Sequence, residues 1–212
     1  MPIKHIAFDL DGTLIDSEHL MKYSWDKTTK ELNINCGFNE YRKYIGLPFE
    51  IILEKLNLHK MNTEISEKYF ESNAKNIELI HLNKGVQEIL NFLDKYSITY
   101  SIVTSKPRSN TLEVLKYFNL PINFFVSSDD VKYGKPYPDS MKLIMDNFNI
   151  QEDDIIYVGD MMVDLSFAIN SKVKFVHYVS GKGKIFNNNL IANYKSIDHL
   201  CDLKDFTQTK DS

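Results

Sequence analysis

The chain has 212 residues, of which 43% are hydrophobic and 25% are charged, and its formal net charge is −4. This composition is typical of a globular protein with a sizeable core, and the negative charge disfavours a nucleic-acid-binding surface. No apolar run approaches the ~20 residues of a membrane span, and acidic residues interrupt the N-terminal apolar stretch, unlike a signal peptide. Cys36 and Cys201 lack a metal-binding spacing. We therefore expect a cytoplasmic protein, monomeric or homodimeric, without nucleic-acid or membrane partners.

The first predicted element is a buried strand within the apolar run Ile3–Leu10. Two carboxylates, Asp9 and Asp11, stand at the end of this run, and Gly12 follows them. A glycine at this point allows the chain to turn sharply. The sequence therefore predicts two acidic side chains at the end of a buried strand.

A long segment after this strand has the pattern of helices. Between residues 16 and 83, apolar residues recur at helical spacing and no convincing strand is present. An insertion of about 70 residues is too long for a simple connection and indicates a small domain. We expect an all-helical cap over residues 16–83, a core made of residues 1–15 and 84–206, and a disordered tail at 207–212.

Short apolar runs alternate with amphipathic helical patterns in the rest of the chain. The predicted strands are Thr99–Thr104, Phe124–Ser127, Ile155–Val158 and Val173–Tyr178. Such alternation of strands and helices is typical of parallel sheets covered on both faces. The predicted fold class is thus α/β, with a doubly wound, Rossmann-like parallel-sheet core and an inserted helical cap.

Polar residues follow the other predicted strands as well. Thr104 and Ser105 end the second run, Lys135 follows the third, and Asp160 and Asp164 follow the fourth. Ligands of open parallel sheets bind beyond the carboxyl ends of the strands. These side chains are therefore expected to gather with the acids of the first strand into one site.

The first of these motifs, Asp9-Leu10-Asp11-Gly12-Thr13-Leu14, resembles that of the haloacid dehalogenase-like (HAD) hydrolases. The segments at Thr104, Lys135 and Asp160 resemble the other three motifs of that family, in the same order. The resemblance implies a phosphoryl-transfer enzyme in which the side chain of Asp9 attacks phosphorus. Asp11 is implied to protonate the leaving alcohol and then to deprotonate the attacking water.

The resemblance also implies a metal ion and a set of phosphate contacts. Mg²⁺ would be bound by Asp9, Asp160 and the backbone carbonyl of Asp11, with Asp164 joining directly or through water. The phosphoryl group would be held by Gly12, Thr104, Ser105 and Lys135.

An all-helical insert at this place is similar to the caps of phosphoglycolate phosphatases and β-phosphoglucomutases. By this similarity Arg42, Tyr44 and Phe49 are expected nearest the leaving group and would select the substrate. The favoured function is an Mg²⁺-dependent phosphatase acting on a small phosphorylated metabolite, such as a phosphoglycolate, sugar, polyol or amino-alcohol phosphate. A sugar-phosphate mutase and a catalytically silent phospho-ligand-binding protein remain open as alternatives.

Overall fold

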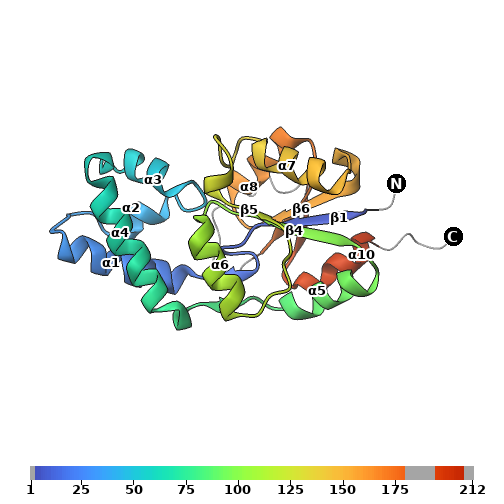
Figure 1. The fold of residues 1–212 in the computed structure, drawn as a ribbon, viewed down its shortest axis with the longest axis horizontal. Helices are drawn as coiled ribbons and strands as arrows, with labels where there is room; N and C mark the ends of the chain where they lie inside the picture. The colour runs from blue at the N-terminus through green and yellow to red at the C-terminus, as the bar shows by residue number, and fades with distance from the viewer. Residues whose placement is uncertain (1–2, 180–193, 208–212) are drawn as a thin grey trace.

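The computed structural model describes residues 3–179 and 194–207. Their main element is a six-stranded parallel sheet of order β5-β4-β1-β6-β7-β8 (Figure 1). The strands of this sheet are β1 (His5–Phe8), β4 (Thr99–Val103), β5 (Phe125–Val126), β6 (Ile155–Gly159), β7 (Lys174–Tyr178) and β8 (Lys195–Ile197). The α/β parallel-sheet core predicted from the sequence is confirmed, and β8 is an addition at the edge.

The strand order places a topological switch at the centre of the sheet. From β1 the chain builds outward through β4 to β5, and it then returns to the other side of β1 with β6 and β7. In register, Phe8 lies opposite both Ile102 of β4 and Val158 of β6. The residues that follow these three strands therefore meet at one edge of the sheet, in the crevice where ligands of such sheets bind.

Helices cover both faces of the sheet, and each face has its own hydrophobic cluster. The helices of this part are α5 (Val86–Lys95), α6 (Arg108–Tyr117), α7 (Asp139–Phe148), α8 (Met162–Ser171) and α10 (Lys204–Thr207). The clusters place α5 and α6 on one face, and α7 and α8 on the other. In α5 the buried side chains are Val86, Ile89, Leu90 and Leu93, a spacing that forms a single apolar stripe.

The inserted segment forms a separate cluster of helices beyond the carboxyl ends of the strands (Figure 1). These helices are α1 (Glu18–Glu31), α2 (Phe38–Arg42), α3 (Phe49–Lys55) and α4 (Asn62–Lys75). Trp25 is fully buried among them, donates a hydrogen bond from Nε1 to the Cys36 carbonyl at 2.9 Å, and stacks on Tyr41. The helical unit thus has a hydrophobic core of its own.

Two short strands, absent from the sequence prediction, join this unit to the sheet. β2 (Ile15–Asp16) pairs antiparallel with β3 (His81–Leu82). The Asn83 side chain donates hydrogen bonds to the carbonyls of Gly12 and Thr13, at 3.0 and 2.9 Å. The linkers into and out of the helical unit therefore lie side by side, bonded to the loop after β1.

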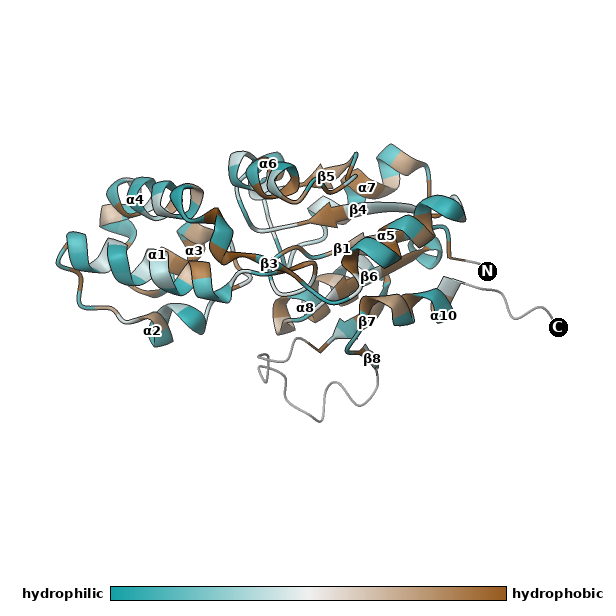
Figure 2. Ribbon diagram, turned by 90° about the horizontal axis from the view of Figure 1, so that it is seen from below, coloured by the Kyte–Doolittle hydropathy of each residue, from teal (hydrophilic) through white to brown (hydrophobic). Residues whose placement is uncertain are grey.

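The distribution of apolar and polar residues follows the arrangement of the sheet and the helices. Figure 2 shows apolar residues along the inner strands and polar residues over much of α1 and α4. Among the described residues, no helix combines the length and the apolar character that crossing a membrane requires. The tail predicted at 207–212 falls outside the described residues except for Thr207, which ends α10.

Candidate active site

The carboxyl ends of β1, β4 and β6 bring the predicted polar residues together. The Asp9 amide donates to the Val158 carbonyl of β6 at 2.8 Å, and the Thr104 amide donates to the Val126 carbonyl of β5 at 2.9 Å. Asp9, Thr104 and Asp160 are all at most 8% exposed. The sheet itself, rather than a mobile loop, therefore fixes the positions of these backbones.

Lys135 forms ion pairs with two buried acidic side chains of the site. Its ammonium lies 2.5 Å from Asp9 Oδ1, 2.8 Å from Asp164 Oδ1 and 3.2 Å from the Tyr157 hydroxyl. The side chain is 2% exposed, so solvent screens these interactions weakly. Although burial alone would lower it, the Asp164 and Asp9 carboxylates raise the pKa of Lys135 above its ordinary range. Lys135 is therefore a permanent cation held beside Asp9.

Three buried carboxylates converge next to this cation. Oxygen atoms of Asp9, Asp160 and Asp164 lie within 4.8 Å of one another. Burial raises the pKa of Asp9 to about 7, against the opposing effect of Lys135. Burial, and then the neighbouring Asp9 and Asp164, raise the pKa of Asp160 well above its ordinary range. When ionised, the three carboxylates outnumber the single ammonium of Lys135, and their all-oxygen donor set fits a hard divalent cation.

Both carboxylate oxygens of Asp164 have protein partners. Oδ1 accepts hydrogen bonds from Lys135 and from the Tyr157 hydroxyl, at 2.8 and 2.9 Å. Oδ2 accepts from the Met161 backbone amide at 3.0 Å, a contact typical of the first turn of a helix. The sequence left open whether Asp164 binds the metal directly or through water. These contacts favour the indirect role, in which Asp164 orients Lys135 and Tyr157.

Gly12 allows the closest backbone approach in the site. Its φ is +97°, and a Cβ at this position would lie 2.3 Å from Asp160 Oδ2. Its amide donates to the Ile15 carbonyl at 2.7 Å, which closes the turn after β1. The observed role of Gly12 is thus to let the Asp160 carboxylate reach the loop that carries Asp11.

Asp11 lies on the side of the site that faces the helical unit. Its carboxylate accepts a hydrogen bond from Ser17 Oγ at 2.6 Å and forms an ion pair with the Lys106 ammonium at 3.2 Å. Ser105 also points toward the helices, because its hydroxyl donates to the Gly46 carbonyl at 2.7 Å. The loop that holds Gly46 is therefore bonded directly to the sheet part of the site.

A cavity of about 60 Å³ lies between the sheet and the helical unit. Asp9, Asp11, Thr104, Ser105 and Lys135 line its sheet side. It follows that the predicted nucleophile and the predicted acid and base line the same cavity. This is the geometry that a reaction between a bound ester and these two carboxylates requires.

Comparison with known proteins then identifies the family. A family model described as haloacid dehalogenase-like hydrolase matches residues 6–178. The chain belongs to this family. The HAD resemblance drawn from the motifs is confirmed, and with it the expectation of a phosphatase-type hydrolase.

Several relatives of this HAD hydrolase are similar over most of their length. A pyrophosphatase PpaX from Oceanobacillus iheyensis is 30% identical over 171 residues, covering 78% of each chain. A phosphoglycolate phosphatase from Photorhabdus laumondii is 27% identical over 78% of this chain and 76% of its own. The crystal structure of a hydrolase from Pseudomonas syringae has a TM-score of 0.83 and 26% identity, covering 95% of this chain and 96% of that one.

The residues expected to select the substrate are separated by the structure of this HAD hydrolase. Phe49 lines the cavity. Arg42 instead pairs through Nε with Glu18 Oε1 at 2.9 Å and borders a separate surface depression. Tyr44 packs against the core of the helical unit, with the Lys55 ammonium 5.7 Å from its ring. Of these three residues, Phe49 alone lines the described cavity and is placed to meet a leaving group.

Other cavity residues were not predicted as part of the site. They are Met21, Tyr41, Ile45, Gly46, Leu47, Ile52, Tyr69, Phe70, Lys106, Pro107 and Met161. The helical spacing of the aromatic residues indicates only that they are buried, because a residue lining a cavity and a residue filling a core give the same periodicity. Lys106 directly follows Thr104 and Ser105 of the second motif, and this position in the sequence could have identified it as a site residue.

Proposed function

We propose that this HAD hydrolase is an Mg²⁺-dependent phosphatase that hydrolyses the monoester of a small phosphorylated metabolite through an aspartyl-phosphate on Asp9. The observation that carries the proposal is the position of Asp9. Asp9 lines the cavity beside the Lys135 ammonium, and Asp11 lines the same cavity. The relatives named as phosphatases and pyrophosphatases support the same class of reaction.

Asp9 and Asp160, with the backbone carbonyl of Asp11, would hold the metal ion. When bound, Mg²⁺ neutralises the carboxylates and draws electron density from a phosphoryl oxygen. The Lys135 ammonium provides a second positive charge, so the anionic ester can approach the anionic Asp9. The Thr104 hydroxyl, together with the Ser105 amide, is placed to hold a phosphoryl oxygen in line for transfer.

The reaction then has two displacements at phosphorus. An Asp9 carboxylate oxygen forms a bond to phosphorus while the bond to the ester oxygen breaks, and Asp11 gives its proton to the departing alkoxide. A water molecule then attacks the phosphorus of the aspartyl-phosphate and gives a proton to Asp11. Breaking the bond to Asp9 releases inorganic phosphate and restores both carboxyl groups to their starting protonation states.

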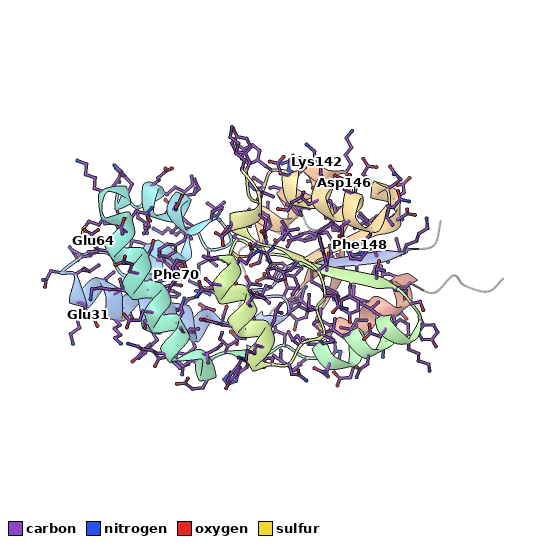
Figure 3. All side chains as sticks on the ribbon, in the orientation of Figure 1. Glu31, Glu64, Phe70, Lys142, Asp146 and Phe148 are labelled. Carbon is purple, nitrogen blue, oxygen red and sulfur yellow. The ribbon has the colours of Figure 1, made fainter. Side chains whose placement is uncertain are left out.

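The test is release of inorganic phosphate from a panel of small phosphate monoesters. Wild-type protein with Mg²⁺ should turn over, and excess chelator should abolish the activity. Asp9→Asn should lower kcat by at least ~10³-fold because the nucleophile is lost. Asp146→Asn, an exposed acid on α7 (Figure 3), is the matched control and should remain within twofold of wild type. Activity that survives chelation, or that Asp9→Asn retains within tenfold, would contradict the proposal.

A further inference from the structure

The helical unit lines its side of the cavity with apolar and aromatic side chains. The rings of Phe49 and Tyr69 stack with centroids 4.7 Å apart, and Phe70 lies 4.9 Å from Phe49 and 5.3 Å from Tyr69. Phe70 is carried by α4, one of the two long helices of this unit (Figure 3). Ile45 and Leu47, in the loop that Ser105 contacts, continue the same wall. The group attached to the phosphate therefore meets a packed, largely carbon surface.

Among the described residues, no charged side chain of the helical unit lines this wall. The two ammonium groups that do line the cavity, those of Lys106 and Lys135, come from the sheet side. Lys106 pairs with Asp11 at 3.2 Å, and Lys135 pairs with Asp9 and Asp164. Both cations are thus paired with carboxylates of the site.

The helical unit does offer one polar feature to the cavity. The hydroxyls of Tyr41 and Tyr69 lie 3.0 Å apart, and both rings are 3% exposed. Either oxygen can be the donor of this bond, which leaves the hydrogen of the other hydroxyl available. The Tyr69 hydroxyl is also hydrogen-bonded to the Asn73 side chain. The pair offers a ligand at most a neutral hydrogen-bond partner and carries no charge that could balance an anion.

We infer that the leaving group of the substrate is a short alcohol without an ionised group, apolar apart from at most one hydroxyl. An ester whose alcohol carries a carboxylate or a second phosphate is selected against, because its charge would be buried against this wall without a counter-ion. The inference rests on the proposed phosphatase function and adds the substrate class. It separates this chain from its relatives, whose names specify phosphoglycolate and pyrophosphate.

The test compares two esters of equal carbon number, 2-hydroxyethyl phosphate and phosphoglycolate, which differ mainly in a hydroxymethyl group against a carboxylate. With the wild-type protein and Mg²⁺, kcat/KM for 2-hydroxyethyl phosphate should exceed that for phosphoglycolate by about 100-fold or more. Equal values within threefold, or a preference for phosphoglycolate, would overturn the inference and leave the phosphatase proposal standing. Failure to hydrolyse either ester or any other monoester would overturn both.

The second part of the experiment adds a positive charge to the apolar wall by substitution. Ile45→Lys places an ammonium on the apolar wall and should raise the ratio of phosphoglycolate to 2-hydroxyethyl phosphate kcat/KM by at least ~10-fold. Tyr23→Lys, on the 43% exposed Tyr23 of α1, adds the same charge outside the cavity and should leave the ratio unchanged within twofold. Leu47→Lys replaces Ile45→Lys if circular dichroism shows that the latter is unfolded. An unchanged ratio in a folded wall variant would show that the wall does not face the leaving group.

Discussion

His5 makes the stability of this protein depend on pH in a way that can be calculated from its surroundings. It lies on β1 and is fully buried. Its Nδ1 and Nε2 atoms are each 2.8 Å from a hydroxyl oxygen, of Thr99 and Ser101 respectively, and the centroid of the Phe148 ring lies 4.5 Å from that of the imidazole. A neutral imidazole satisfies both hydroxyls with one donor and one acceptor. Burial lowers the pKa of His5 from 6.5 to about 3.

The sign of the effect follows from these two pKa values. Between pH 6.5 and about 3 the unfolded chain binds a proton at His5 and the folded chain does not, so the free energy of unfolding falls as the pH falls. At roughly 1.4 kcal/mol for each pH unit, the loss amounts to about 2 kcal/mol at pH 5 and about 5 kcal/mol at pH 3. Above pH 6.5 the residue contributes no pH dependence.

Urea unfolding of the wild type and of His5→Gln, at pH 7.5 and at pH 5 in chelator, measures this loss. Acidic side chains contribute to acid destabilisation of both proteins, so the difference between their pH dependences isolates His5. We expect the wild type to lose about 2 kcal/mol more than the variant over this interval. His59→Gln, at an exposed position, should behave as the wild type. Equal pH dependence of wild type and His5→Gln, within ~0.5 kcal/mol, would refute the argument.

Three further substitutions test the site. Tyr157→Phe removes the hydroxyl that donates to Asp164, and we expect kcat to fall about 10-fold with KM little changed; an unaltered kcat would contradict this positioning role. Arg42→Ala should change kcat/KM by less than threefold, because Arg42 pairs with Glu18 outside the cavity, and a loss above tenfold in steady-state kinetics would place it at the substrate. Gly12→Ala forces a methyl group against a carboxylate at positive φ, so thermal unfolding should show destabilisation by at least ~2 kcal/mol, and an unchanged melting temperature would argue against this geometry.

The central strands were predictable because each is a short apolar run followed at once by a polar residue. β1 and β6 are buried throughout, and β4 is buried from Ser101 to Val103, and their sequences show it. β2 and β3 have two residues each, too few to show any periodicity. In β8, at the sheet edge, Lys195 and Ser196 are exposed and only Ile197 is buried. The sequence of this strand therefore has the polar pattern typical of a loop.

The candidate site was predictable where residues follow strands, and not where side chains point inward from regular elements. Asp9, Thr104 and Asp160 meet because parallel strands end at one edge of the sheet. Tyr157 lies within β6 and reads as core, although its hydroxyl contacts Lys135 and Asp164. Arg42 was predicted to lie near the leaving group but lies outside the cavity. The direction of such a long side chain depends on its ion-pair partner, here Glu18, and not on its place in the sequence.

The paired linkers β2 and β3 have a mechanical consequence. Asn83 bonds the returning linker to Gly12 and Thr13, and Asp11 itself forms a bridge with Ile15 at the start of the outgoing one. A rotation of the helical unit about β2 and β3 would therefore displace the nearby segment that carries Asp11. Asp9 would keep its position, because its backbone is hydrogen-bonded to β6 of the sheet. In the proposed mechanism, access to the cavity and the position of Asp11 would therefore depend on the same short stretch of backbone.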